Sequence, residues 1–405
     1  MRVPCVSCKG KGMCGRPVCP VLARKTAVFK LKQKKIEKDF YGSTPPNIFV
    51  GRFNYPNVNL GTLTAPFEDN SSVYDDVSYW LANKLNIEKI AEYRFNLLNS
   101  KTSVNVKRAG SGRFIEQIQQ IAMSSNNLNL EVNLQKKPVF KFTSQPNITP
   151  FGGTADIVKA VICTNPLIKA PVEKVFSDTD FKATEAIVYL KQRNFDESFL
   201  TKLLSAGTLG IKSQRKLVPT RWAITAVDDS LAKELAEKVR LESTLDCYEV
   251  FYGGHYGNRF LIILFPRIWS FELFEFYTKD SLWANNREQF THDYEFYQGR
   301  KDYAEQCSGG YYASRLPVLE YLSKIRKQAS ALIIREVSSE YWLPLGVWVV
   351  RTAVRKALQN KKSFNSREEA LNYAEKLLRI NFSTVKKESK ILSEIKNQKS
   401  LNEFF

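Results

Sequence analysis

Four of the chain's seven cysteines lie within the first nineteen residues. They are separated by two, five and four residues: Cys5, Cys8, Cys14 and Cys19. A segment this short buries almost no apolar surface, so a bound metal must supply its folding free energy. Zinc binds four thiolates at about 2.3 Å, and these spacings let one small loop supply all of them. The spacing therefore predicts a structural Zn²⁺ site, with an iron–sulfur cluster or free thiols as the alternatives.

The net charge of +19 is concentrated at the two ends of the chain. Residues 1–38 carry eleven lysines and arginines against one acid, and residues 351–405 carry thirteen against six. Residues 39–350 are nearly balanced, with 36 basic and 34 acidic side chains. Basic ends attract a phosphate backbone by releasing its counterions, although such ends are also commonly solvated and idle. Charge thus favours nucleic-acid contact, with Lys9, Lys11 and Arg16 beside the cysteines as candidate contacts.

The overall composition is that of an ordinary globular protein. Of the 405 residues, 43% are hydrophobic and 25% are charged, which excludes a disordered chain, a fibrous repeat and a disulfide-stapled mini-protein. No apolar run approaches the roughly 18 residues that span a bilayer, and the N-terminus has no apolar signal region. We therefore expect a cytoplasmic protein without a membrane partner, associated with the nucleoid through its contact with DNA.

The hydrophobic pattern mixes helical and strand-like segments without a regular βαβ rhythm, which predicts an α+β fold. Helices are expected at residues 72–98, 113–123, 183–206 with a division near Asn194, 228–241, 313–334, 346–359 and 366–379. Strands are expected at residues 47–51, 128–134, 139–143, 222–227, 247–252 and 259–265, the last two joined as a hairpin. Residues 156–163 suit either a strand or a helix. Asp228 with Asp229, and Ser366 with Glu369, are expected to cap helices.

Three parts follow one another along the chain. Residues 1–40 are expected to form the zinc module and a basic arm, and a turn-rich stretch at residues 41–46 marks its boundary. Residues 41–385 form the globular α+β body, with a break into two subdomains near 150–220 as an option. Residues 386–405 are polar and rich in lysine, which predicts a frayed helix followed by a flexible tail.

The last eight residues combine a polar stretch with two terminal phenylalanines. A single 3₁₀ turn would place Leu401, Phe404 and Phe405 on one side as an apolar plug. Gln398 would lie one turn earlier as a hydrogen-bonding anchor. This pattern resembles the PCNA-interacting peptide, through which proteins bind the sliding clamp. The alternative is a tail that folds back onto its own body.

Three segments of the body mix arginine with glycine and aromatic residues. They contain Arg52, Arg221 and Arg315, which are candidate nucleic-acid contacts beside rings that can stack on bases. For any one segment, ordinary packing with a surface arginine is the simpler interpretation. Convergence of several segments in one groove would indicate a nucleic-acid or nucleotide site.

The sequence does not single out a catalytic site. It contains only two histidines, of which His255 lies in a glycine-rich turn. His255 and Asp156, which follows a second glycine turn, are weak candidates for catalytic residues. That second turn lacks the Gly-Lys-Ser/Thr of a phosphate-binding loop. Glu336 and Glu340 suit a solvated helix face better than a shared metal site, so enzymatic activity is left open.

Several blocks of the sequence match a known family. They are residues 5–20, 49–52, 55–56, 217–222, 251–260 and 309–315, together with the terminal peptide. In these blocks, and over its whole length, the chain resembles the archaeal Nre family of DNA repair proteins. The resemblance implies a role in DNA damage, recruitment to the sliding clamp and a zinc-binding N-terminus. It implies no settled enzymatic reaction.

The leading hypothesis is a DNA repair factor that docks on the clamp through its tail and holds DNA through the zinc module and basic surfaces. One alternative is an enzyme that acts on DNA or on a nucleotide through the body. Loss of turnover on changing His255 or Asp156, with DNA binding intact, would favour it. The other alternative is an RNA-binding zinc protein, which predicts preference for RNA and no dependence on Phe404 or Phe405.

Overall fold

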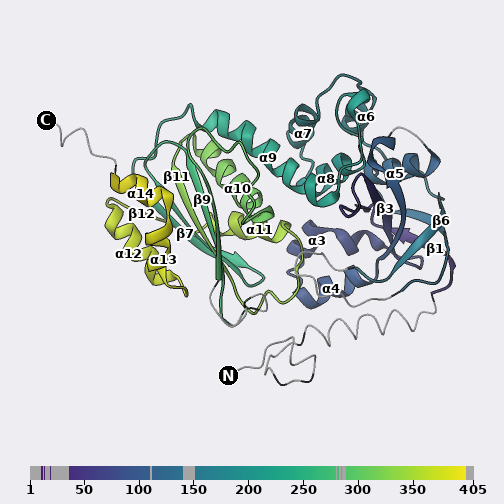
Figure 1. The fold of residues 1–405 in the computed structure, drawn as a ribbon, viewed down its shortest axis with the longest axis horizontal. Helices are drawn as coiled ribbons and strands as arrows, with labels where there is room; N and C mark the ends of the chain where they lie inside the picture. Colours follow the sequence, from purple (N-terminus) through teal and green to yellow (C-terminus); the bar gives the residue numbers. More distant parts are fainter. Residues whose placement is uncertain are drawn as a thin grey trace. The chain divides into compact units, whose positions relative to one another are not determined.

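Figure 1 shows the computed structural model of the chain, which describes residues 36–109, 112–139, 151–279 and 289–397, with isolated residues between them and near the N-terminus. Several predictions lie outside the described residues. They concern the strand beyond Val139, the cysteines Cys5, Cys8 and Cys14, the contacts Lys9 and Arg16, and the tail residues Gln398, Leu401, Phe404 and Phe405. Within the described residues, helices and strands combine into two mixed six-stranded sheets, which confirms the α+β fold.

The chain divides into two compact units. Met1–Leu231 with Leu343–Leu345 forms the first, and Ala232–Trp342 with Gly346–Phe405 forms the second. The change of unit falls within helix α9 (Thr220–Val239), later in the chain than the 150–220 interval considered from the sequence.

The sheet of the first unit has the spatial order β1-β5-β6-β4-β3-β2. Its strands are β1 (Asp39–Thr44), β2 (Ile48–Val50), β3 (Asn57–Thr64), β4 (Leu98–Asn105), β5 (Leu128–Leu134) and β6 (Thr154–Ile162). β4 and β6 run parallel, whereas the other paired strands of this sheet run antiparallel. The end of β1 also meets the end of β3, because Ser43 and Ala65 exchange backbone hydrogen bonds of 3.1 and 2.8 Å. The sheet therefore closes into a barrel through β1.

The barrel encloses the apolar core of the first unit. Side chains alternate along β5, so that Leu130 and Val132 are buried while Glu131 between them is exposed. Helix α5 (Arg113–Met123) adds Ile115 and Ile118 to the same core at helical spacing. The described residues of this unit also form the helices η1 (Ser71–Asp75), α3 (Val77–Ala82), α4 (Ile87–Phe95), η2 (Val106–Arg108), α6 (Ala170–Ser177), α7 (Ala183–Lys191), α8 (Glu197–Ser205), η3 (Lys212–Gln214) and the start of α9.

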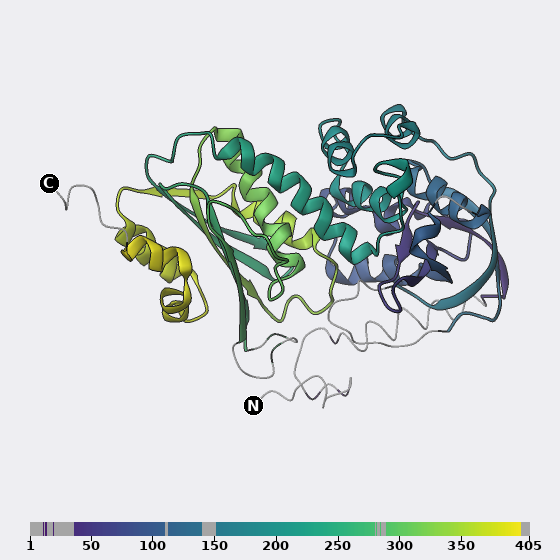
Figure 2. The same cartoon turned by 45° about the horizontal axis from the view of Figure 1, so that its top comes forward.

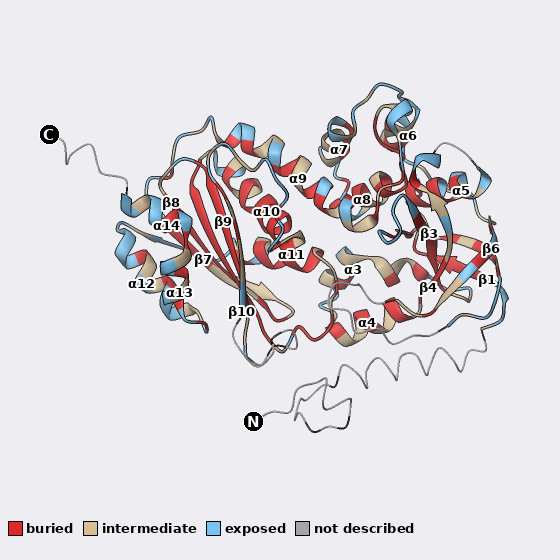
Figure 3. Cartoon of the chain, in the orientation of Figure 1, coloured by how far each residue is buried: buried red, intermediate tan, exposed pale blue. Residues whose placement is uncertain are grey.

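The sheet of the second unit has the order β10-β9-β11-β8-β7-β12. Its strands are β7 (Tyr248–His255), β8 (Asn258–Phe265), β9 (Ser270–Tyr277), β10 (Gln289–Glu295), β11 (Ser330–Val337) and β12 (Lys361–Phe364), and its central strands are buried (Figure 3). Figure 2 shows the green helices α10 (Gly309–Ile325) and α11 (Trp348–Ala357) on one face of this sheet. The yellow helices α12 (Arg367–Leu377), α13 (Phe382–Glu388) and α14 (Lys390–Asn397) pack on the other face.

Many local predictions are confirmed. α5, β5 and α11 form where their periodicity places them, residues 156–163 fall mostly in the strand β6, and α7 and α8 are divided at Asn194, whose φ is 65°. The β7–β8 hairpin turns at Tyr256-Gly257, where both residues have positive φ, as a tight two-residue turn requires. The Ser366 side chain accepts a hydrogen bond from the Glu369 amide, so the cap of α12 is also confirmed.

The helix expected at residues 72–98 is wrong, because the structure has η1, α3, α4 and the start of β4 there. Asp76 and Asn86 each cap a new helix with their side chains, and Lys84 between those helices has a φ of 50°. The helix expected at 313–334 is wrong in its second half. Arg326, with a φ of 52°, ends α10, and β11 follows.

Two other predictions are also wrong. Residues 222–227 are not a strand, since Thr220 opens the 20-residue helix α9, and Asp228 and Asp229 lie inside that helix rather than at its cap. Residues 41–46 are not simply a turn, since residues up to Thr44 form β1. In both places the pairing or packing with distant residues overrides the local propensity.

Candidate nucleic-acid interface

An arginine and two aromatic side chains lie in the loop between β2 and β3, residues 51–56. Phe53 and Tyr55 are 63% and 46% exposed, so neither ring belongs to the core. The guanidinium carbon of Arg52 lies 5.1 Å from the centroid of the Phe53 ring. Solvent-exposed aromatic rings can stack on bases while a neighbouring cation contacts the phosphate.

The structure brings this loop together with the start of α9. The rings of Tyr55 and Trp222 lie 5.2 Å apart between centroids and are tilted by 50°, and Trp222 is 44% exposed. Arg221 directly precedes Trp222 in the helix. Two of the three arginine-aromatic segments therefore converge, as a nucleic-acid site requires.

Hydrogen bonds fix the start of α9 against the barrel. The Val50 amide donates to the Thr220 hydroxyl at 3.0 Å, although the two residues are 170 positions apart. The Ser205 hydroxyl lies 3.2 Å from the same oxygen and donates to the Val218 carbonyl at 2.8 Å. Trp222 is thus positioned beside the loop by the backbone of β2.

Buried charges hold the turn that leads into β2. The Asp75 carboxylate accepts hydrogen bonds from the Asn47 amide and the Arg94 guanidinium. The Lys202 ammonium donates to the Pro46 carbonyl at 3.0 Å. Burial lowers the pKa of Lys202, while the Asp75 carboxylate acts in the opposite direction and favours the charged form. These contacts give the exposed loop a rigid base.

The outer face of β3 and β4 is polar. The register pairs Asn57 with Asn105 and Asn59 with Ser103, and these side chains alternate with the inward residues of the barrel core. The Asn105 amide donates to the Asn57 side-chain oxygen at 2.9 Å. Lys101 adds a charge to the same face, where it lies 3.3 Å from the Asp156 carboxylate. This face therefore offers hydrogen-bond donors and acceptors to a ligand.

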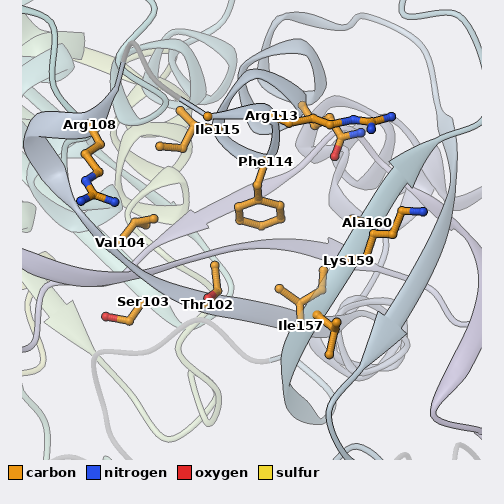
Figure 4. A pocket seen from close by; sticks show the side chains of 13 residues that line it. Thr102, Ser103, Val104, Arg108, Arg113, Phe114, Ile115, Ile157, Lys159 and Ala160 are labelled. Carbon is orange, nitrogen blue, oxygen red and sulfur yellow. The ribbon is translucent and has the colours of Figure 1, made fainter.

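A basic hollow of about 450 Å³ continues from this face. It lies where β4 and β6 diverge, since their pairing covers only Asn99–Lys101 and Thr154–Asp156. Figure 4 shows Phe114 between the two strands, with Arg108 on one side and Lys159 on the other. The hollow is lined by Thr102, Ser103, Val104, Arg108, Gly112, Arg113, Phe114, Ile115, Gln117, Ile157, Val158, Lys159 and Ala160.

A second hollow of about 470 Å³ shares Ser103, Val104 and Arg108 with the first. It adds Lys107 and the two paired asparagines of β3 and β4. The Val106 amide donates to the Pro56 carbonyl at 2.9 Å, so the aromatic loop is fastened to the segment that carries Lys107. The aromatic loop, the polar face and the basic hollows therefore form one continuous surface, which we call the barrel interface.

The other predicted contacts lie elsewhere or outside the described residues. Arg315 belongs to the second unit, where it is 2% exposed, and its Nε donates to a Glu295 carboxylate oxygen at 2.8 Å. Its guanidinium therefore ties α10 to β10 in the core. Lys11 is exposed.

The two weak catalytic candidates lie in different units. Asp156, in the first unit, is exposed on β6 beside Lys101. His255, in the second unit, ends β7 and lies against the Tyr256 ring, with the ring centroids 3.8 Å apart. Burial, and to a smaller degree the positive charge of Lys356, lower the pKa of His255. Both effects favour the neutral form of its imidazole.

Glu336 and Glu340 do not share a helix face, so that interpretation is wrong. Glu336 lies in the buried strand β11, where one carboxylate oxygen accepts hydrogen bonds from the amides of Arg379 and Ile380 at 2.7 and 3.0 Å. Burial raises the pKa of Glu336, whereas the two amide hydrogen bonds lower it. Glu336 thus holds the chain entering α13 against the sheet.

Among the described residues, no group of three or more histidine, cysteine, aspartate or glutamate side chains could hold a metal ion. Of the four N-terminal cysteines only Cys19 is described, so the zinc site stays a prediction. None of the described helices is long and apolar enough to cross a membrane.

Sequence reasoning missed the basic part of the barrel interface. Lys107, Arg108 and Arg113 lie within seven consecutive residues that also contain two glycines, and this density of positive charge is visible in the sequence. Lys159 carries no such signal, because it stands alone on a strand and reaches the hollow only through the pairing of β6 with β4.

The fold and the barrel interface define an α+β protein of two units with a candidate nucleic-acid-binding surface on the first. Two family models match consecutive parts of the chain, and the first match ends between β9 and β10, inside the second unit, rather than at the change of unit within α9. The model described as archaeal Nre, N-terminal, matches residues 13–284, and the model described as archaeal Nre, C-terminal, matches residues 295–404. The chain belongs to the archaeal Nre family.

Curated relatives match over most of their length. The DNA repair protein NreB of Archaeoglobus fulgidus is 37% identical over 374 residues, which cover 92% of each chain. The DNA repair protein NreA of the same organism is 38% identical over 377 residues, covering 92% of this chain and 93% of the relative. NreA of Haloferax volcanii is 36% identical over 329 residues, covering 79% and 78%. No solved structure matches the chain significantly.

Proposed function

We propose that this protein is a DNA repair factor that binds DNA and is recruited to the sliding clamp. The observation that carries DNA binding is the convergence of Tyr55 and Trp222 beside the basic hollows of the barrel interface. The relatives, which are named DNA repair proteins, support the role in repair. The basic residues around the N-terminal cysteines would add a second DNA-binding surface through counterion release.

Recruitment to the clamp rests on the C-terminal peptide. Gln398 follows helix α14 immediately in the sequence, and Leu401, Phe404 and Phe405 supply the apolar side chains of the pattern. A short peptide loses conformational freedom when it docks, so it binds weakly by itself. Simultaneous contact with DNA would raise the effective affinity through avidity.

The clamp prediction is tested by calorimetry with the full chain and the sliding clamp. The wild-type protein should bind with a dissociation constant on the order of micromolar. Phe404→Ala/Phe405→Ala should weaken binding by at least about tenfold, because it removes the apolar plug. Asn402→Ala, in the same tail but between the anchors, is the matched control and should bind like wild type. Equal binding by the double variant, or no binding by wild type, would contradict recruitment through this peptide.

The zinc module is tested by metal analysis of the purified full chain. About one Zn²⁺ per chain is expected, because four thiolates complete a tetrahedral site. Cys8→Ser should lose most of this metal, whereas Cys163→Ser, which changes a cysteine outside the N-terminal group, should retain it. Iron with sulfide in place of zinc would establish a cluster, and wild-type protein without bound metal would establish free thiols.

A further inference from the structure

The barrel of the first unit has a recognisable topology. β2 continues β1 along the chain, and the two serve as one bent strand, because β1 pairs with β5 and β2 pairs with β3. If this bent strand is counted as the first strand of the barrel, then β3, β4, β5 and β6 are the second, third, fourth and fifth. Around the barrel the strands follow the order first, second, third, fifth and fourth, and the fourth lies next to the first. The third and fifth strands, β4 and β6, are parallel, and α5 lies between the third and fourth. This is the Greek-key arrangement of the OB barrel.

The topology also predicts which strands and loops of the barrel a ligand should contact. In an OB barrel, ligands cross the second and third strands and contact the loops that join the first to the second and the fourth to the fifth strands. Here these elements are β3, β4, the aromatic loop 51–56 and the segment after β5, which begins with exposed Lys136 and Lys137. The barrel interface shares β3, β4 and the aromatic loop with this set of elements.

The chemistry of this surface fits single strands better than duplexes. The exposed rings of Phe53 and Tyr55 can bind only to the face of a base, and in a duplex the base faces are covered by neighbouring base pairs. The paired asparagines of β3 and β4 offer donors and acceptors, which unpaired base edges and sugars require. Arg113 and Lys159 supply charges for the phosphates.

From these observations we infer that the barrel interface is a binding site for single-stranded DNA. The inference rests on the proposed DNA-binding function and specifies its substrate class. Bases stack on the loop 51–56, the strand crosses β3 and β4, and its backbone enters the basic hollow between β4 and β6. A site of this extent holds about four nucleotides or slightly more, at the lower end for one OB barrel.

The test measures binding of the full chain to a fluorescent fifteen-nucleotide oligothymidine, to a duplex of equal length and to oligouridine of equal length. Wild type should bind the oligothymidine most tightly. Phe53→Ala/Tyr55→Ala should weaken this binding by about tenfold or more, because two stacking rings are removed. Tyr41→Ala, which removes a half-exposed ring from β1 of the same barrel, should bind like wild type.

The contribution of the basic side chains to single-strand binding is tested with a second pair of variants. Arg113→Gln/Lys159→Gln should make the negative slope of log K against log salt concentration shallower by about 1.4 for the single strand, since two phosphate contacts are lost. Lys84→Gln/Lys212→Gln removes two exposed charges of the same unit that line neither hollow, and should leave the slope near the wild-type value. An unchanged unfolding midpoint in each variant confirms that the barrel is intact.

The outcomes separate this inference from the proposed function. If wild type binds none of the three nucleic acids, the proposed DNA-binding function fails with it. If wild type prefers the duplex and the aromatic double variant binds like wild type, DNA binding stands and the single-strand site is refuted. Preference for oligouridine would replace the DNA assignment by RNA binding.

Discussion

Glu272→Ala is expected to lower the free energy of unfolding of the second unit by about 4 kcal/mol. The Glu272 carboxylate is fully buried in β9 and accepts hydrogen bonds from the Ser389 hydroxyl and from the Lys390 and Ile391 amides. The His292 Nε2 atom lies 2.6 Å from the same carboxylate. Alanine would leave these four groups without their partner in the interior, and an unpaired buried polar group is costly.

The measurement is urea unfolding, with hydrogen exchange at the amides of β9 to report on the second unit separately. Glu375→Ala is the matched control, since its carboxylate pairs with Lys386 at 2.7 Å while both side chains are more than 40% exposed. The control should lose less than about 1 kcal/mol. Equal losses for the two variants would show that Glu272 does not hold α14 against the sheet.

Gly42→Ala is expected to destabilise the first unit by about 3 kcal/mol. A Cβ atom on Gly42 would lie far inside van der Waals distance of the Ala65 carbonyl oxygen, which is backbone and cannot turn away. Ala65 is the residue through which β3 meets β1, where Ser43 and Ala65 exchange their hydrogen bonds. The substitution therefore strains the closure of the barrel itself.

Hydrogen exchange at the Ser43 and Ala65 amides should become faster in Gly42→Ala, together with a lower unfolding midpoint. Gly51→Ala is the control, because its Cβ would meet Asn59 at 3.4 Å, an ordinary contact, and it should cost less than about 1 kcal/mol. If Gly42→Ala leaves both the exchange and the midpoint as in wild type, β1 and β3 do not close the barrel in solution.

Local pattern was sufficient where one face of an element is buried throughout. The isoleucines of α5 recur at helical spacing and the apolar residues of β5 alternate, so both elements were predicted with their bounds. The local pattern was insufficient for residues 72–98, because apolar residues continue at helical spacing across the turn that separates α3 from α4. The chain turns at Lys84, which has a positive φ, and the Asn86 side chain caps the next helix, so no glycine or proline marks the break.

In the barrel interface too, some residues could be predicted from local sequence and others could not. Arg52 and Arg221 could be chosen from the sequence because arginine stands beside aromatic residues in each segment. Arg315 has the same local signal, yet its guanidinium is buried against Glu295, a partner twenty positions earlier that local pattern does not reveal. Whether an arginine serves the core or the surface depends on which carboxylate the fold places next to it.

The sequence by itself determined the α+β class, the family resemblance, and the predictions for the four N-terminal cysteines and the terminal peptide. Each of these depends on residue types at fixed short spacings, which the chain carries whatever its fold. Only the tertiary structure decided that six strands close through β1 and that Tyr55 meets Trp222. Those features arise from hydrogen bonds and packing between residues far apart in the chain, such as Val50 and Thr220, and no local pattern encodes their pairing.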